Sequence, residues 1–365
     1  MARYRSEPPH THGDTPSTAV LIVNLGTPAA PTTSAVRSYL REFLSDPRVV
    51  EIPRILWWPL LNGVILNLRP KASAAKYALV WEDEGSPLAV HTEKQAQRLA
   101  ERLRHDGHEG IVVDWAMRYG NPSIPDALER LKARGCTRIV ILPLYPQYAA
   151  STTASVIDEV GRNLKHYRNQ PEIRFVRSFP DHPGYIGALA QSVREHWQAH
   201  GEPERLVMSY HGIPRRSLDL GDPYYCECHK TSRLLAEALG LPRERWEMTF
   251  QSRFGKTEWL QPYTEPTLRE MASNGVKSVD VICPGFVSDC LETLEEIAME
   301  CREAFLTSGG KEFRYIPCLN ERTEWITALS ALCTAHLGNW LTDPQPSSME
   351  REQSASLARA HGAQR

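Results

Sequence analysis

One segment pattern occurs twice along the chain, and this internal repeat constrains the fold more than any other feature of the sequence. Three pairs of segments match in the same order: AVLIVNLGTP (19–28) with LVMSYHGIP (206–214), AMRYG (116–120) with QSRFG (251–255), and RIVILPLYP (138–146) with VDVICPGFV (279–287). Each match is short, but the shared order, at offsets of 186, 135 and 141 residues, is informative. We therefore predict one α/β unit that is used twice, with unequal insertions.

Runs of β-branched residues alternate with helical stretches, which is typical of helices layered on parallel sheets. Strands are expected where continuous apolar runs suit burial on both faces, at residues 19–24, 110–114, 138–142, 206–210 and 279–283. Helices are expected at residues 92–106, 124–135, 153–166, 184–199, 232–240, 266–275 and 321–341. The predicted fold class is α/β, with two similar domains, each a parallel sheet flanked by helices, and a cleft between them.

A length of 365 residues favours two domains over a single core. The expected parts are a flexible N-terminal segment (1–18), a first domain (19–166), a second domain (167–318), a C-terminal helix that packs back on the first domain (319–342) and a flexible polar tail (343–365). His10 and His12 lie in the N-terminal segment, and we expect no metal site there.

Charge and hydropathy exclude several classes of partner. Lys plus Arg number 42 against 44 for Asp plus Glu, a net charge of −2, so no basic field would recruit nucleic acid. Residues 1–18 lack the apolar core of a secretory leader, and the apolar stretch 55–66 is too short to span a bilayer. Its Trp57 and Trp58 allow either peripheral membrane contact or a buried helix turn. We expect a cytoplasmic location.

Eight cysteines in a chain of this length, with no expected export signal, indicate reduced thiols. Cys226 and Cys228 precede His229 in the segment CECH. This C-x-C pair has no second pair nearby and so lacks the four ligands of structural zinc. A nucleotide-phosphate site is not expected either, because neither a G-x-G-x-x-G nor a G-x-x-x-x-G-K-[ST] motif is present.

The two repeats differ at the carboxyl ends of their strands, where doubly wound sheets bind ligands. Leu25 in the first repeat corresponds to His211 in the second, and Ser151 corresponds to Glu292. One wall of a shared crevice would therefore be apolar, while the other would carry a base and an acid. This asymmetry suits a flat hydrophobic substrate with a reactive polar centre.

His211 is the first candidate active-site residue, because it follows a strand and precedes Gly212 and Pro214. Glycine permits a sharp turn and proline ends regular pairing, so the imidazole is expected at the mouth of the strand. A neutral imidazole there could accept a proton or bind a metal ion such as Fe²⁺. A hydrogen-bonded structural histidine is the alternative.

An acidic row follows the last predicted strand: Glu292, Glu296 and Glu300 recur at i, i+4 and i+8. Such a row keeps one face of a helix, and a wider π turn would align it better. Like charges at this spacing destabilise an isolated helix, so the row needs solvent or a compensating cation. We interpret it as a path of oxygen ligands that leads a divalent metal ion to His211. A solvated helix face is the alternative.

Five segments resemble the ferrochelatase family, particularly its proteobacterial members, over about residues 19–340. They are NLGTP, LYPQYAASTT, LVMSYHGIP followed by LGDPYY, FQSRFGKTEWLQPYT and CPGFVSDCLETLEEI. The resemblance implies two Rossmann-like domains that hold a porphyrin in the cleft between them. It also implies a lyase that inserts Fe²⁺ into protoporphyrin IX, the last step of haem biosynthesis.

The resemblance further implies roles for individual residues. His211 matches the family's active-site histidine, which binds metal and accepts pyrrole protons. Glu292 matches its partner carboxylate, with Glu296 and Glu300 on a π-helical metal path. The resemblance also implies six porphyrin-binding residues. Leu25 would make an apolar contact with the macrocycle, Arg118 and Tyr119 would line the opposite wall, and Arg69, Tyr77 and Ser86 would form a lip that meets the propionates.

The sequence also departs from part of the family. Ala150 stands where animal members carry a cluster-binding cysteine, and their cysteine-rich carboxyl extension is missing. We therefore expect no tightly bound cofactor and no [2Fe–2S] cluster of the animal type. The expected partners are protoporphyrin IX and Fe²⁺, for a monomer or homodimer. The alternatives are a chelatase for coproporphyrin or another tetrapyrrole, and a non-catalytic haem or iron carrier.

Overall fold

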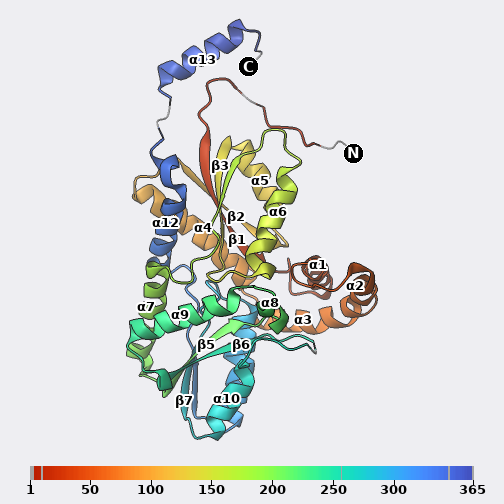
Figure 1. Ribbon diagram of the computed structural model, residues 1–365, viewed down its shortest axis with the longest axis vertical. Coiled ribbons are helices and arrows are strands. Elements are labelled where there is room, and N and C mark those ends of the chain that lie inside the picture. The colour runs from red at the N-terminus through yellow and green to blue at the C-terminus, as the bar shows by residue number, and fades with distance from the viewer. Residues whose placement is uncertain (1–3, 10, 256, 344–345, 364–365) are drawn as a thin grey trace.

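Two four-stranded parallel sheets, each flanked by helices, follow one another along the long axis of the molecule (Figure 1). The computed structural model describes residues 4–9, 11–255, 257–343 and 346–363. The strand order is β2-β1-β3-β4 in the first sheet and β6-β5-β7-β8 in the second. The second order is the first with every strand number raised by four. The internal repeat of the sequence is therefore one sheet topology used twice, and we call the two halves the first and second repeats.

The strands of the two sheets are β1 (Ser17–Gly26), β2 (Ile111–Tyr119), β3 (Cys136–Pro143) and β4 (Glu172–Phe175), then β5 (Arg205–His211), β6 (Trp246–Gln251), β7 (Ser278–Ile282) and β8 (Glu312–Tyr315). The helices are α1 (Thr33–Leu44), α2 (Arg54–Leu60), α3 (Leu66–Val80), α4 (Pro87–His105), α5 (Ile124–Ala133), α6 (Ser155–Leu164), α7 (Pro183–His200), α8 (Arg215–Asp219), α9 (Tyr224–Leu239), α10 (Thr264–Ser273), α11 (Arg302–Thr307), α12 (Thr323–Leu337) and α13 (Ser348–Ala360). Within the described residues, three π-helices, η1 (Leu61–Ile65), η2 (Ala150–Ala154) and η4 (Glu292–Cys301), and two 3₁₀ turns, η3 (Arg243–Arg245) and η5 (Gly338–Leu341), complete the order.

The strand β4 corrects one predicted boundary. Its four residues, EIRF, pair in parallel with β3, with Ile173 opposite Ile139. Residues 172–175 thus complete the first sheet, although the sequence-based prediction places them in the second domain. Two of the four residues are charged, so the segment lacks the continuous apolar run by which the other strands are found. The remaining domain boundaries stay a prediction.

A glycine allows β1 and β2 to stay paired up to their carboxyl ends. Gly26 ends β1 with φ of +119°, and a Cβ atom there would lie 1.8 Å from the carbonyl oxygen of Tyr119. No side chain fits that space, and the positive φ also favours glycine. The preceding residue, Leu25, is consequently held at the mouth of the first sheet.

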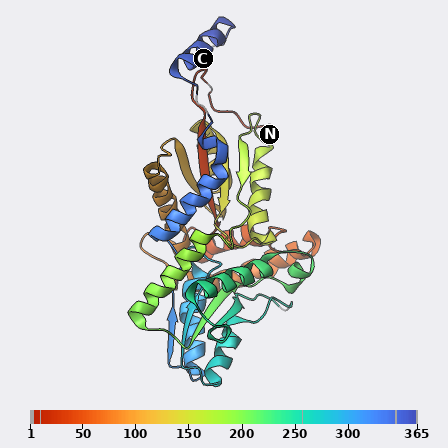
Figure 2. The same cartoon turned by 60° about the vertical axis from the view of Figure 1, so that its left-hand side comes forward.

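The last helix of each repeat lies against the other repeat (Figures 1 and 2). α7 follows β4 but packs against α9 of the second repeat, whereas α12 follows β8 but packs against α4 of the first. An arginine on each fourth strand binds the end of the exchanged helix. Arg174 donates to the carbonyl oxygens of His336 (3.0 Å) and Leu337 (2.7 Å), and Arg314 donates to that of His200. A cation at a helix C-terminus satisfies free carbonyl groups and opposes the helix dipole.

The two exchanged helices also cross each other within the core. The ring of Tyr185 on α7 lies 6.1 Å from that of Trp325 on α12, and both side chains are fully buried. One continuous hydrophobic cluster includes these two helices and strands of both sheets. The repeats are therefore joined by a shared core, which fixes the position of one sheet relative to the other.

The end of the chain contains more structure than its composition predicts. Residues 343–365 are expected to be a loose tail, but α13 forms over Ser348–Ala360. Its first turn is closed by a capping box between Ser347 and Glu350, a signal that is present in the sequence as S-x-x-E. Part of both predicted terminal segments, residues 1–3, 10, 344–345 and 364–365, lies outside the described residues.

We predict that the α7–α12 crossing does not tolerate a side chain at Gly184. A Cβ atom there would lie 2.8 Å from Cβ of Ala328, so Gly184→Ala should cost about 1–3 kcal/mol through overpacking. Gly187→Ala on the same helix is the matched control, because nothing lies within 4 Å of its Cβ position. That control should be neutral or stabilise by about 0.5–1 kcal/mol. Urea unfolding measures both, and equal effects would contradict the packing account.

Candidate active site

The residues that correspond in the two repeats meet at one place. Leu25, next to the end of β1, packs in a small apolar cluster with Phe286 and Cys290 of the second repeat. His211 ends β5, and its ring lies 6.5 Å from the ring of Phe286 and 6.5 Å from that of Trp259. The apolar wall and the histidine wall predicted from the repeat therefore both border Phe286.

The backbone fixes the protonation pattern of the His211 imidazole. Nδ1 lies 2.6 Å from the carbonyl oxygen of Gly212, which can only accept a hydrogen bond. Nδ1 of the neutral ring therefore carries the proton, and Nε2 keeps its lone pair. Such a hydrogen bond to the remote ring nitrogen is also what orients histidines that bind metals. His211 is half-buried, and Nε2 is the ring nitrogen left to act as a base or ligand.

A buried glutamine connects the histidine strand to the acidic helix. Gln251 ends β6 directly beside His211 in the sheet register. Its Nε2 donates to the carbonyl oxygen of Glu292 (2.7 Å), and its Oε1 accepts from Ser209 (2.7 Å). Gln251 thus links the two predicted partners: its backbone lies beside His211 in the sheet, and its side chain bonds the backbone carbonyl of Glu292.

The carboxylate of Glu296 is clamped beside this glutamine. It accepts from the backbone N–H of Ser252 (2.7 Å), from the hydroxyl of Ser252 and from Nε2 of Gln251 (3.4 Å). Burial raises the pKa of Glu296, against the opposing effect of the Ser252 hydrogen bonds and the His211 charge, and the charge of Glu292 raises the pKa further. Glu296 therefore interacts with both predicted catalytic residues.

The acidic row lies on a π-helix, as the resemblance implies. η4 begins at Glu292, and the first repeat has its own π-helix, η2, at the corresponding place, where Ser151 is the second residue. The predicted correspondence of Ser151 with Glu292 is therefore matched by backbone geometry. Both π-helices begin just after the third strand of their sheets, which places their first turns at the mouth of the crevice.

Glu300, the outermost residue of the predicted path, faces a different partner. Lys76 on α3 lies 2.8 Å from Oε1 of Glu300 and 2.9 Å from Oε1 of Glu295. Burial lowers the pKa of Lys76, but the hydrogen bonds that its ammonium donates to these two carboxylates outweigh burial and raise the pKa. The structure thus brings His211, Glu292 and Glu296 together, while it holds Glu300 in an ion pair at the outer end of η4.

The expected porphyrin lip is divided between exposed and buried residues. Arg69 is exposed on α3, and its guanidinium lies 4.5 Å from the ring centroid of Phe254 in the loop after β6. Tyr77 and Ser86 are buried, and the hydroxyl of Ser86 accepts from Thr27 (2.7 Å), directly after Gly26. Only Arg69 of these three therefore presents its polar group to solvent at the lip.

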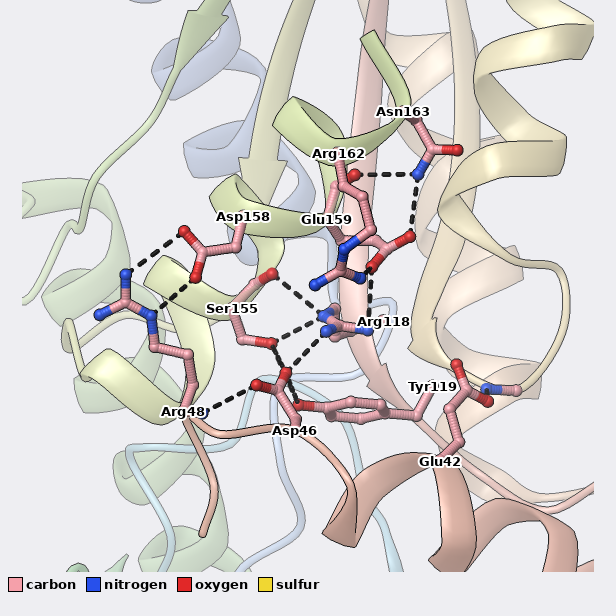
Figure 3. Close-up of polar contacts among 11 residues, drawn as sticks. Glu42, Asp46, Arg48, Arg118, Tyr119, Ser155, Asp158, Glu159, Arg162 and Asn163 are labelled. Atoms are coloured by element: carbon pink, nitrogen blue, oxygen red, sulfur yellow. Dashed lines mark hydrogen bonds and ion pairs between the residues drawn. The ribbon is translucent and has the colours of Figure 1, made fainter. Parts of the chain in front are cut away.

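The two residues of the opposite wall are part of a buried polar network (Figure 3). Arg118 donates to Asp46 (2.6 Å) and to the hydroxyl of Ser155 (2.7 Å), and the hydroxyl of Tyr119 donates to Asp46 (2.8 Å). Burial raises the pKa of Asp46, but hydrogen bonds from Ser155, the backbone and Tyr119, together with the Arg118 charge, outweigh it and lower the pKa. The polar groups of Arg118 and Tyr119 are thus hydrogen-bonded within the protein, and we expect both side chains to stabilise this wall.

Several residues that hold the site are not predicted from the sequence. Some of them lie in a segment that the repeat comparison identifies, and others lie in segments without any motif. Gln251 and Ser252 lie in the QSRFG segment that the repeat comparison singles out, so their position was visible although their role was not. Asp46 and Lys76 lie in helical or loop segments without a motif. Lys76 meets Glu295 across 219 residues of chain, and no local pattern predicts such a pair.

The CECH segment forms no metal site in the part of the chain that the structure describes. Cys226 is exposed and Cys228 is buried, and the ring of His229 stacks edge-on against Tyr225 at 4.4 Å. Among the described residues, no cluster of three or more His, Cys, Asp or Glu side chains is arranged to hold a metal ion, and the eight cysteines are free thiols.

The comparison with known proteins decides the family. A family model described as ferrochelatase matches residues 17–337. The chain is 67% identical to the ferrochelatase of Aromatoleum aromaticum, with all of both chains covered, and 64% identical to that of Azoarcus sp. strain BH72, covering 100% of this chain and 99% of the relative. The chain belongs to the ferrochelatase family. As a ferrochelatase it is a lyase of haem biosynthesis that inserts metal into a porphyrin.

Solved structures share the fold of this ferrochelatase at low sequence identity. SirB from Bacillus subtilis with Fe³⁺ aligns with a TM-score of 0.52 at 13% identity, over 90% of this chain and 98% of that chain. The sirohydrochlorin chelatase SirB from the subspecies spizizenii in complex with cobalt aligns with a TM-score of 0.50 at 13% identity. The predicted α/β fold class with two similar sheet domains is confirmed.

We predict that the Asp46–Arg118 pair stabilises the wall of the ferrochelatase crevice. Asp46→Asn keeps the shape of the side chain but leaves the buried Arg118 charge with only the more distant Glu159 carboxylate (3.8 Å), which should cost up to about 3–5 kcal/mol. Asp158→Asn is the control, because its pair with Arg48 is exposed and should contribute less than about 1 kcal/mol. Urea unfolding compares the two. An Asp46→Asn loss no larger than that of the control would contradict the assignment.

Proposed function

We propose that the chain inserts Fe²⁺ into protoporphyrin IX to form protohaem, with His211 as the base and metal ligand. The observation that carries this proposal is the hydrogen bond from Nδ1 of His211 to the Gly212 carbonyl, which leaves the lone pair on Nε2. A base or ligand at the mouth of a crevice needs that tautomer in place before the substrate arrives.

Metallation exchanges two pyrrole protons for one Fe²⁺ ion, so the protein has to accept two protons and deliver one cation. We assign both proton acceptances, one after the other, to Nε2 of His211, once its lone pair has released the Fe²⁺ ion to the porphyrin. The carboxylates of Glu292 and Glu296 would then hold the imidazolium charge and pass the proton outward. The raised pKa of Glu296 supports this order, because a carboxylate with a raised pKa is a better proton acceptor.

The porphyrin would lie between the two repeats, with Leu25 against one face and His211 toward its nitrogen atoms. Arg69 is the candidate partner of a propionate, since its fork is bidentate and permanently charged. Release of Arg69 from the Phe254 ring would accompany that contact. Binding energy from the apolar faces and the propionates would supply the roughly 1–5 kcal/mol needed to bend the ring.

We further propose that the chain works in the cytoplasm without a tightly bound cofactor, with Fe²⁺ as a substrate, and as a monomer or homodimer. A chelatase for coproporphyrin or another tetrapyrrole, and a haem or iron carrier, remain the alternatives. Anaerobic incubation with Fe²⁺ and protoporphyrin IX separates them through the loss of porphyrin fluorescence. Multiple turnovers support the enzyme, a single equivalent indicates a carrier, and turnover of coproporphyrin alone would indicate the other substrate.

We predict that His211→Ala folds and binds protoporphyrin IX but loses haem synthesis by at least about 10²-fold, the usual contribution of a positioned general base. His105→Ala is the control, because that side chain is 83% exposed at the end of α4. The same fluorescence assay, with a porphyrin binding titration, measures both variants. Normal turnover by His211→Ala would exclude the base and ligand roles.

An exposed apolar patch on α2, η1 and α3 is the candidate surface for peripheral membrane contact. Trp57 is buried and donates to the carbonyl oxygen of Leu44, whereas Trp58 is 47% exposed. The other members of the patch are Ile52, Ile55, Leu56, Leu60, Val64 and Leu68. No helix among the described residues has the length and apolar character needed to cross a bilayer.

We predict that Leu56→Ser weakens binding to phospholipid vesicles by about tenfold, since burial of a leucine contributes about 1.5–3 kcal/mol. Leu220→Ser is the matched control: its side chain is 66% exposed beside α8, against 67% for Leu56. Co-sedimentation with vesicles of phosphatidylcholine and phosphatidylglycerol measures both. Equal binding of the two variants and the unmodified chain would rule out the patch.

A further inference from the structure

The acidic row of η4 requires a compensating cation, and the structure supplies one from the other repeat. Glu292, Glu295, Glu296 and Glu300 follow one another within nine residues, and such repulsion destabilises a helix unless it is balanced. Lys76 lies within 3.0 Å of carboxylate oxygens of both Glu295 and Glu300. The positive charge comes from α3 of the first repeat, which packs beside η4.

The spacing of both elements makes this contact specific. Residues five apart lie on one face of a π-helix, so Glu295 and Glu300 converge on a single ammonium group. On α3, Arg69 and Lys76 are seven apart, which places them on one face of an α-helix. That face is turned to η4 at Lys76, which reaches both Glu295 and Glu300. The two helices thus face each other with opposite charge.

The contact is buried at one end and open at the other. The side chain of Glu295 is 7% exposed, whereas those of Lys76 and Glu300 are 43% and 54% exposed. A lysine has a flexible stem and a strongly hydrated head group, so its ammonium can move into water without breaking the fold. A divalent cation that arrives from solvent reaches this end of η4 first.

We propose that Lys76 is an exchangeable counter-ion for the outer end of η4, which the divalent substrate ion displaces from Glu295 and Glu300 on its way to His211. This inference rests on the proposed metal insertion and adds a positioning residue to it. The exchange balances charge, because one ammonium leaves two carboxylates and one divalent ion takes its place. Lys76 therefore keeps the row stable when no metal is present, at the cost of weaker metal binding.

Direct metal binding tests the exchange without any catalysis. Lys76→Met keeps the stem and removes the charge, so Glu295 and Glu300 lose their partner and the melting temperature should fall in metal-free buffer. Zn²⁺ should then raise the melting temperature of Lys76→Met by more than that of the unmodified chain. Lys71→Met on the same helix is the matched control and should show the same Zn²⁺ shift as the unmodified chain. A Zn²⁺ shift for Lys76→Met equal to or below that of the unmodified chain would overturn the proposal.

Steady-state kinetics with protoporphyrin IX and Fe²⁺ give a second readout. Lys76→Met should lower the KM for Fe²⁺ about threefold to tenfold and leave the KM for porphyrin within twofold, while Lys76→Arg should behave as the unmodified chain. Glu300→Gln removes one of the two carboxylates, so it should raise the KM for Fe²⁺ alone and should abolish the gain in the Lys76→Met background, a coupling that a double-mutant cycle measures. An unchanged or raised KM for Fe²⁺, or a change confined to the KM for porphyrin, would overturn the counter-ion role.

The two proposals fail in different ways. If the unmodified chain forms no haem from Fe²⁺ and protoporphyrin IX, the proposed function is wrong whatever the Zn²⁺ shifts are. If it forms haem normally and Lys76→Met changes neither the Zn²⁺ shift nor the KM for Fe²⁺, only the counter-ion is wrong.

Discussion

The exchange of α7 and α12 between the repeats is the constraint on which the rest of the structure depends. Each helix is bound at its end by an arginine of the fourth strand, Arg174 or Arg314, and both cross in one shared core at Tyr185 and Trp325. Two domains joined only by a linker would move relative to each other. Here the mouths of the two sheets keep a fixed relative position, which a crevice for a rigid macrocycle requires.

The duplication gives two walls of the same shape with different chemistry. Ser155 of the first repeat corresponds to Glu296 of the second, at the same offset as Ser151 and Glu292. In the first repeat, Ser155 belongs to a closed network in which Asp46 neutralises Arg118. In the second, Glu296 is held by Ser252 and interacts with the charges of His211 and Glu292. One wall is therefore internally satisfied, whereas the other carries the residues that we propose for metal binding and proton transfer.

The sequence predicts those parts of the structure that depend on local pattern or on the repeat. The strands β1, β3, β5 and β7 and the strand-end position of His211 follow from motif order and spacing, whereas the π-helical form of the row after Glu292 is implied by the resemblance to the ferrochelatase family. Short strands such as β4 carry no apolar run, and Lys76 pairs with Glu295 across 219 residues, so neither leaves a local signal. The sequence does not predict the α13 helix, because the polar composition of residues 343–365 favours a loose tail. Its S-x-x-E capping motif is nevertheless present in the sequence.

The central claim is that His211 and the first carboxylates of η4 form one metal-binding centre at the mouth of the second sheet. The most direct measurement is anomalous diffraction from crystals soaked in Co²⁺, recorded on both sides of the cobalt absorption edge. The account predicts an anomalous peak within bonding distance of Nε2 of His211 and of a carboxylate oxygen of Glu292 or Glu296. A peak found only away from His211, such as beside Cys226 and His229, would contradict it.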